Sequence, residues 1–299
     1  MSDNSLRYFA AVAEHGSIRK AAELLHVAQS AVSRQVMKLE DQFGMPLLER
    51  LPRGVRVTFA GQIVLRHARD QLGQLERVRS EIAALKGLVR GVVRIHAIEA
   101  LTHEVLPSAI ARFSERYPGV TFNVSIARTN EILDALREVQ TDLGFAFCPQ
   151  LDANLASRFR IRAPIMALVS PGHPLVAAAS VTLAELAEFP IALSSGPSGS
   201  RGLIDAACRQ AGVHLAPTLE TNSMRLITQL VRTVGGIALL PRWAASISIR
   251  SNGLVAIRIR NRVLNSATVD AVALRSRQLS PAVDQFQDFV RAELERLGE

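Results

Sequence analysis

Apolar residues recur at helical spacing through the first 45 positions of the chain. The pattern predicts three short helices, over residues 6–14, 18–25 and 29–41. Gly16 ends the first helix, and Ser17 is a suitable N-cap for the second. Only three residues, 26–28, separate the second helix from the third. The spacing therefore predicts a compact helical unit with a tight turn between its last two helices.

The helix predicted over 29–41 is apolar on one side and polar on the other. Its polar side carries amide, hydroxyl and cationic groups: Gln29, Ser30, Ser33, Arg34 and Lys38. Such groups suit the edges of DNA bases and backbone phosphates. We therefore interpret the pair of helices as a helix-turn-helix whose second helix enters the major groove. A solvated helix face is the alternative for each of these side chains.

A short hairpin is expected directly after these helices. A turn at 52–54 separates residues 46–50 from the alternating segment 55–59, which is typical of a strand. A hairpin in this place makes the helix-turn-helix winged. Arg50, Arg53 and Arg56 would lie on or beside the wing, within reach of phosphates or the minor groove. Ser17 is both an N-cap and a candidate phosphate contact.

Residues 60–88 are predicted to form one long helix. Leu65, Ala68, Leu72 and Leu75 follow a 3–4 spacing, which Val78, Ile82 and Leu85 continue after a small phase slip. This apolar stripe either packs on its own domain or meets a partner chain. Because the helix lies between two domains and carries Arg and Glu around the stripe, we expect it to form a homodimer.

Beyond residue 90 the pattern changes to alternating strands and helices. Strands are expected at 92–95, 120–126, 143–147, 165–169, 191–193, 219–221, 237–240 and 269–274. Helices are expected at 101–117, 130–139, 183–187, 199–211, 224–233 and 282–297. This alternation indicates an α/β domain with largely parallel sheets. About 210 residues is large for one sheet, so two sub-domains are expected.

Composition and charge narrow the class of protein. The net charge is +8, and residues 1–90 hold 14 Lys and Arg against 9 Asp and Glu, an excess of +5. This concentration of positive charge around the helix-turn-helix supports double-stranded DNA as a partner. No apolar run is long enough for a membrane span, and no secretory signal begins the chain. We expect a cytoplasmic protein with no membrane partner.

The segment LRYFAAVAEHGSIRKAAELLHVAQSAVSRQVMKLEDQFGMPLLER, followed by RGVRVTFAG, resembles the LysR-type transcriptional regulators. Shorter segments continue the resemblance along essentially the full length: LPSAIARFSERYPGVTF, DLGFAF, VSPGHPL and GGIALLP. The resemblance implies a winged helix-turn-helix over 1–59, a dimerising linker helix over 60–88 and an effector-binding domain over 91–299.

The resemblance also implies the architecture of that last domain. It would be a two-lobed α/β domain similar to type 2 periplasmic binding proteins, with a small-molecule effector between the lobes. Lobe one would comprise 91–163 and 268–299, and lobe two 164–267. Proteins of this type commonly form homotetramers. Ligand-dependent movement of the lobes would control DNA binding allosterically.

Candidate effector-binding residues follow from strand ends and from the resemblance: Glu99, Ala100, Thr102, Thr129, Phe147, Ser195, Ser200, Arg201 and Asn222. Glu99 departs from the small polar residues usual there. Its carboxylate would repel an acidic effector and favour an amine or hydroxyls, or it simply stabilises a helix start. The Ser- and Gly-rich loop before Arg201 is a candidate anion site. The effector would carry a carboxylate and a cationic or hydroxyl end.

The sequence also bears on catalysis and on redox sensing. No His residue lies in a metal-ligand or nucleophile motif, and no phosphate-binding loop follows a strand, so we expect no enzyme, no catalytic residue, no metal and no cofactor. A redox-sensing regulator acting through Cys148 and Cys208 is the alternative function, although buried free cysteine is the default for both.

Overall fold

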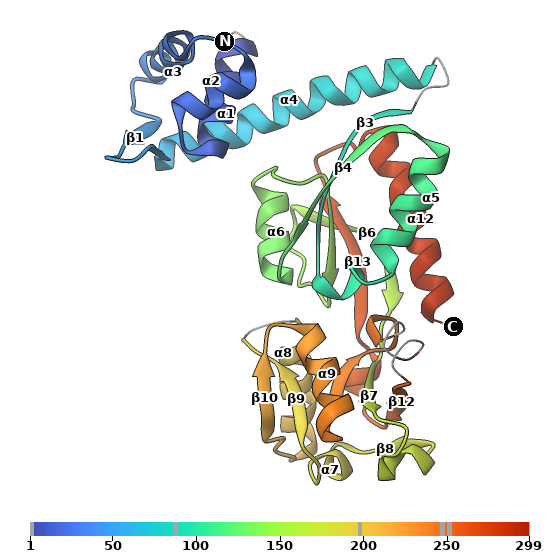
Figure 1. The fold of residues 1–299 in the computed structure, drawn as a ribbon. Coiled ribbons are helices and arrows are strands. Elements are labelled where there is room, and N and C mark those ends of the chain that lie inside the picture. The colour runs from blue at the N-terminus through green and yellow to red at the C-terminus, as the bar shows by residue number, and fades with distance from the viewer. Residues whose placement is uncertain (1–2, 86–88, 197–198, 246–248, 250–252, 299) are drawn as a thin grey trace. The chain divides into compact units, whose positions relative to one another are not determined.

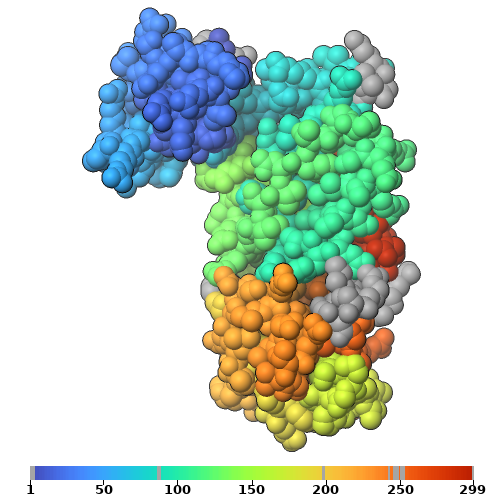
Figure 2. Space-filling view, viewed as in Figure 1, coloured from blue at the N-terminus to red at the C-terminus, as the bar shows by residue number. Residues whose placement is uncertain are grey.

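The chain forms two compact units, one of residues 1–82 with 138–140 and one of residues 83–137 with 141–299. The structure is a computed structural model, and it describes residues 3–85, 89–196, 199–245, 249 and 253–298 (Figure 1; Figure 2).

The first unit is a winged helix-turn-helix followed by a long helix. Its elements are α1 (Asp3–His15), α2 (Ile18–Leu25), α3 (Gln29–Phe43), β1 (Leu48–Arg50), β2 (Val55–Val57) and α4 (Phe59–Leu85). The Ser17 hydroxyl accepts a hydrogen bond from the Lys20 amide and so caps α2, as its position predicts. His26 at φ 54° and Gly44 at φ 64° end α2 and α3 in the left-handed conformation.

The wing is fixed to the helices by backbone contacts. β1 and β2 pair antiparallel, with Glu49 opposite Arg56. The Val55 amide donates to the Gly16 carbonyl at 2.9 Å. A Cβ at Gly54 would lie 2.4 Å from that same oxygen, and Gly54 has φ +93°, so glycine is required at this turn. The wing therefore stands at a set position beside the start of α2.

The two halves of α4 have different environments. Val64, Leu65 and Ala68 are buried in the core of the first unit. Apolar side chains in the second half are exposed, namely Leu75, Val78, Ile82 and Leu85. This change of environment comes before the phase slip in the sequence pattern, because Leu75 is already exposed. The first half thus packs on its own domain, while the second half leaves its apolar side chains to solvent. The predicted end of the helix at 86–88 lies outside the described residues.

One lobe of the second unit is built on a five-stranded sheet in the order β4-β3-β5-β13-β6. Its strands are β3 (Arg90–Ala97), β4 (Gly119–Ile126), β5 (Leu143–Phe147), β6 (Leu155–Arg162) and β13 (Thr268–Leu274). Helices α5 (Val105–Arg116) and α12 (Pro281–Gly298) cover one face, and α6 (Thr129–Arg137) covers the other (Figure 1). Because both faces are covered, β5 is buried along its whole length.

The other lobe has a six-stranded sheet in the order β10-β9-β11-β7-β12-β8. Its strands are β7 (Ile165–Val169), β8 (Ser180–Val181), β9 (Ile191–Ser194), β10 (Pro217–Thr221), β11 (Ile237–Pro241) and β12 (Val255–Ile259). Its helices are α7 (Leu183–Leu186), α8 (Gly199–Ala211), α9 (Met224–Val234) and α11 (Arg262–Asn265). Two 3-10 turns of this lobe are η2 (Pro174–Ala177) and η3 (Arg242–Ala245). A further 3-10 turn, η1 (Glu99–Leu101), follows β3 in the five-stranded lobe.

The expectation of largely parallel sheets holds only in part: β3 runs parallel to β4 and β5, β9 to β10 and β11, and β8 to β12. β13 runs antiparallel to β5 and β6, and β7 runs antiparallel to β11 and β12. β6, β8 and β12 were not expected from the sequence. β6, LASRFRIR, was missed because it is rich in arginine and only two of its eight side chains are buried. The helix expected at 101–117 begins at Val105, because the chain first makes the 3-10 turn η1.

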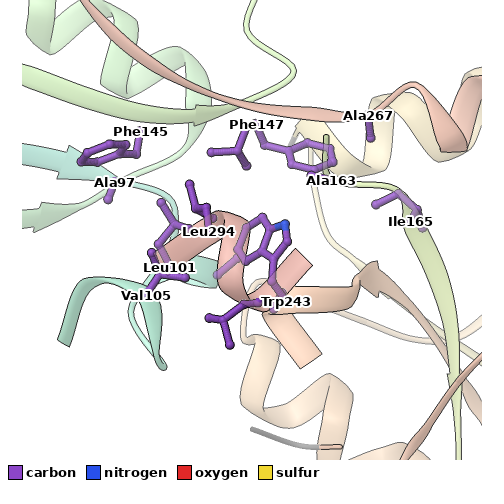
Figure 3. Close-up of a cluster of buried hydrophobic side chains, with 14 of the residues drawn as sticks. Ala97, Leu101, Val105, Phe145, Phe147, Ala163, Ile165, Trp243, Ala267 and Leu294 are labelled. Atoms are coloured by element: carbon purple, nitrogen blue, oxygen red, sulfur yellow. The ribbon is translucent and has the colours of Figure 1, made fainter. Parts of the chain in front are cut away.

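The two lobes share a hydrophobic core where the chain crosses between them. The crossing at residues 163–164 is tied to the other at residue 267 by a 2.8 Å hydrogen bond from the Ala163 amide to the Ala267 carbonyl. Trp243 of η3, only 3% exposed, lies beside Leu101 and Leu294 of the five-stranded lobe (Figure 3). The lobes are therefore packed together on this side.

Candidate functional site

The polar face of α3 is presented to solvent as the sequence pattern predicts. Gln29, Ser30, Arg34 and Lys38 are exposed and Ser33 is half-buried, while the opposite side of the helix packs into the core. The Arg34 Nε donates to the Ser30 carbonyl at 3.3 Å, so its guanidinium stays on this face. Sequence reasoning missed Met37, which is 43% exposed. Its spacing of three from Arg34 and four from Ser33 was the available signal.

The three wing arginines differ in their surroundings. The Arg56 guanidinium donates to Glu49 Oε2 across the hairpin, at 3.1 Å from Nε and 2.7 Å from Nη2. The side chains of Arg50 and Arg53 are exposed, and the structure gives them no ion pair with any described carboxylate. Arg50 and Arg53 are therefore the wing cations with charge to offer a phosphate, whereas the charge of Arg56 is already balanced.

A cavity of about 490 Å³ lies between the two lobes. The five-stranded lobe contributes Ile98, Glu99, Ala100, Ile126, Ala127, Arg128, Thr129, Glu131 and Phe147. The six-stranded lobe contributes Ser194, Ser195, Gly199, Ser200, Asn222, Met224, Leu240 and Pro241. Seven of the nine expected effector-binding residues are among them: Glu99, Ala100, Thr129, Phe147, Ser195, Ser200 and Asn222. Thr102 and Arg201 are not.

The cavity is formed where strands end and helices begin. β3 leads into η1, β4 into α6, and β5 ends at Phe147. From the other lobe, the segments after β9 and β10 lead into α8 and α9. The carboxyl ends of strands in α/β sheets are the usual place for a ligand, because loops and helix N-termini gather there.

Thr129 and Glu99, two residues of the cavity wall, form different kinds of hydrogen bond. The Thr129 hydroxyl is buried and bonded to the backbone of Phe147, donating to its oxygen at 3.1 Å and accepting from its amide at 3.2 Å. Thr129 therefore holds α6 against β5. Glu99 instead reaches across the cleft, where its Oε1 accepts a hydrogen bond from the Met224 amide of α9 at 3.3 Å.

The positive charge on the cleft wall belongs to Arg128. Its guanidinium lies near the opposite lobe, since a Cβ at Gly196 would be 3.9 Å from Arg128 Nη1. Sequence reasoning missed Arg128, although it follows the strand predicted at 120–126 and directly precedes the candidate Thr129. Arg128 is exposed, and it is the basic residue among the described residues that line the cavity.

Arg201 is held by acidic neighbours. Its Nη1 donates to Glu220 and to the Ser194 carbonyl, and its Nε donates to Asp205 at 2.9 Å. The hydrogen bond to Glu220, with further help from Asp205, raises the pKa of Arg201 despite partial burial. The guanidinium is thereby engaged within its own lobe. The Thr102 hydroxyl is also engaged within its own lobe, since it donates a hydrogen bond to the Glu99 carbonyl at 2.7 Å.

Neither cysteine has the environment of a reactive thiol. Burial raises the pKa of the Cys148 thiol, whose sulfur accepts from the Thr268 amide at 3.3 Å. Burial also raises the pKa of Cys208, which is 8% exposed. Oxidant-sensing cysteines have lowered pKa values, because the thiolate is the reactive form. The described part of the chain has no cluster of three or more acidic, His or Cys side chains suited to a metal.

No described helix is long and apolar enough to cross a membrane.

Two domain families match the chain. The bacterial regulatory helix-turn-helix protein, lysR family, matches residues 4–62, and the LysR substrate binding domain matches residues 86–295.

Individual relatives agree with these matches. The RuBisCO operon transcriptional regulator of Allochromatium vinosum is 28% identical over 297 residues, covering 99% of this chain and 98% of that protein. A full-length OxyR variant from Pseudomonas aeruginosa has a similar fold, with a TM-score of 0.79, 22% identity and coverage of 99% and 95% of the two chains.

Full-length CbnR, solved in complex with its target DNA, has a TM-score of 0.64 at 23% identity and covers 98% of this chain and 100% of its own. The winged helix-turn-helix, the two-lobed α/β domain and both domain matches agree. This chain belongs to the LysR family of transcriptional regulators.

Proposed function

We propose that this regulator binds a specific operator through α3 and its wing, and that a small molecule in the cleft between the lobes controls it. The observation that carries the effector part is the cavity of about 490 Å³ with Glu99 and Arg128 on its walls. A cavity of this size, lined by apolar side chains together with polar and charged groups, is suited to a small molecule.

The charges on the cleft walls support a particular class of effector. Arg128 offers an anion partner, and Ser200 adds a hydroxyl at the start of α8. Glu99 is suited to an ammonium or hydroxyl group and disfavours a second carboxylate. The effector is therefore a compound with one carboxylate and a cationic or hydroxyl end, as in amino acids and hydroxy acids.

Two copies of the chain would bind one operator together. The exposed polar face of α3 is suited to the major groove, and the CbnR complex gives a precedent for a similar fold on DNA. The exposed apolar side chains of α4 supply a surface for a second copy, with a homotetramer as the assembled form. Twofold pairing would match two half-sites of a pseudo-palindromic operator.

A thermal-shift screen of the full-length protein tests the effector proposal. Amino acids and hydroxy acids should raise the melting temperature, and a ligand at 100 times its Kd would stabilise by about 2.7 kcal/mol. Each compound that raises it should then alter operator binding in a gel shift. Arg128→Ala should abolish the response, while Arg209→Ala, an exposed arginine at the far end of α8, should keep it.

Two outcomes would contradict the proposal. A response confined to dicarboxylic or aromatic acids would oppose the assigned role of Glu99. The redox alternative would be favoured if no compound changed the melting temperature or operator binding, while peroxide changed operator binding. Peroxide should then also reduce thiol labelling at Cys148 or Cys208.

A further inference from the structure

Glu99 makes a hydrogen bond that joins one wall of the cleft to the other. It begins η1 on the five-stranded lobe, and its Oε1 lies 3.3 Å from the amide nitrogen of Met224, 125 positions further along the chain. Glu99 is half-buried, so the bond is partly shielded from water. The carboxylate makes this a charge-assisted hydrogen bond, and its length of 3.3 Å exceeds the usual range of about 2.7–2.9 Å.

The amide that Glu99 engages is the first of α9. Ser223 caps the same helix through its hydroxyl, which accepts from the Leu226 amide at 3.4 Å. The Met224 amide is not served by that cap, and a helix N-terminus favours negative charge. The carboxylate of Glu99 therefore takes the place where an effector's carboxylate would otherwise be stabilised on this wall.

The remaining contacts place the anion position elsewhere in the cavity. Glu131, the other lining carboxylate, bonds the Arg128 amide at 2.9 Å within its own lobe. The Arg128 guanidinium faces Gly196, on the loop that precedes α8. Opposite charges thus stand at two different places on the cavity wall, Glu99 beside α9 and Arg128 beside α8.

We propose that Glu99 ties the two lobes together across the cleft and, by occupying the amide end of α9, determines the orientation and charge of the effector. This inference rests on the proposed effector cleft. An effector carboxylate is excluded from the α9 wall and directed to Arg128, and the effector's ammonium or hydroxyl group faces Glu99. An effector that draws Glu99 away from Met224 releases the tie between the lobes.

Hydrogen exchange of the Met224 amide in the full-length protein measures the tie without any effector. In Glu99→Ala the amide should exchange about tenfold faster than in the wild type, the factor that corresponds to losing one charge-assisted hydrogen bond. Glu99→Gln keeps an acceptor and should retain most of the protection. Glu131→Gln, a lining carboxylate bonded within its own lobe, should leave the Met224 amide unchanged.

The exclusion of carboxylates is measured with acetate, using chloride at the same ionic strength as the reference. Acetate should raise the melting temperature of Glu99→Ala more than that of the wild type, because the α9 amide is then free to bind it. Equal exchange of Met224 in the wild type and Glu99→Ala, or equal acetate responses in the two proteins, would refute the inference.

These readouts are independent of the effector screen. A screen that finds no effector would count against the proposed function but would not alter the exchange rate of the Met224 amide. Conversely, an effector that binds and regulates normally in a protein whose Met224 amide does not depend on Glu99 would uphold the function and refute the tie.

Discussion

Arg34 is the side chain that we propose for direct contact with DNA bases. It is exposed on the polar face of α3, and the bond to the Ser30 carbonyl keeps it there. We expect Arg34→Ala to lose about 1–3 kcal/mol of operator binding per half-site and to abolish specific binding, because a guanidinium bonds guanine through two hydrogen bonds. A gel-shift titration at physiological salt measures this loss.

The fold should survive this change, since the side chain packs against nothing in the core. An unchanged melting temperature and circular dichroism spectrum would establish that. Arg7→Ala, which removes an equally exposed arginine from α1, should leave specific binding nearly intact. Operator affinity equal to the wild type in Arg34→Ala would exclude Arg34 from base recognition.

The wing allows a comparison between two arginines three positions apart. Arg53 is exposed, whereas Arg56 is paired with Glu49. We expect Arg53→Ala to reduce the slope of log K against log salt by about 0.9 per substituted side chain, as for the loss of one phosphate contact. Arg56→Ala should change the slope less, because its charge is already balanced. Similar slopes for the two variants would contradict this assignment.

At the scale of elements, the packing of α5 against α12 depends on a buried carboxylate. Glu293 is 1% exposed and forms ion pairs with Arg112 of α5 and Arg296 of α12. Burial alone would raise the pKa of Glu293, but hydrogen bonds from Arg112, Arg296 and Ser108 outweigh it, and the pKa lies below its ordinary value. The ionised form is therefore the one that stabilises the fold.

Glu293→Gln should lower the free energy of unfolding by about 1–3 kcal/mol at pH 7, a range that allows for solvent screening of the two half-exposed arginines. Because the folded pKa is depressed, this contribution is fully present above the ordinary carboxyl pKa of about 4.3 and is lost as the pH falls through the lower folded value. Urea unfolding at pH 7 and at acidic pH should show the difference shrinking.

The neighbouring Glu295 provides the control for that measurement. It is exposed on the same helix, and its ion pair within the described part of the chain is an i,i+4 contact with Arg291 at 3.9 Å. Glu295→Gln should change stability by less than about 0.5 kcal/mol at any pH. A destabilisation of Glu293→Gln that stays constant with pH would mean that lost packing, not lost charge, is responsible.

At the scale of the whole molecule, the second half of α4 is expected to hold two copies together. Ile82 is 54% exposed and Val78 42%, which is unusual for apolar side chains on one side of a helix unless a partner covers them. We expect Ile82→Glu to convert dimers or tetramers to smaller species at micromolar concentration, because a carboxylate would be buried in an apolar contact.

Sedimentation or light scattering after gel filtration measures this change of mass. Gln71→Glu places the same charge at an exposed polar position of α4 and should leave the mass unaltered. Operator affinity should fall with Ile82→Glu, since two linked half-sites bind more tightly than one. A mass for Ile82→Glu equal to that of the wild type would place the dimer contact elsewhere.

Elements with strong local periodicity were predictable, and those without it were not. The recognition helix was expected at 29–41 and observed at Gln29–Phe43, because its pattern and its Gly44 stop lie within a few residues of each other. β6 alternates apolar and polar residues only over 158–162, and the apolar run at the start of β12 covers only residues 254–257. Most of the burial of these strands comes from their pairing with β13 and β7.

The residues of the candidate site also differ in whether local pattern or distant contacts determine their roles. Sequence reasoning selected strand ends and so reached seven residues of the cavity wall. It placed the cationic group at Arg201 and overlooked Arg128, because only the tertiary structure brings Glu220 of β10 within reach of Arg201. Cations in a sequence can be counted, but which of them is already paired depends on segments that are distant along the chain.

The amino-acid pattern predicts a winged helix-turn-helix whose second helix has a polar, Arg-bearing face, followed by a long helix and an α/β domain. Those features follow from spacings of two to four residues, which set the faces of helices and strands. The folded chain is needed to show which half of α4 is exposed, which arginine lines the cleft, and that Glu99 contacts α9. These depend on contacts between distant segments, where side-chain pairing and burial are settled by packing and not by local pattern.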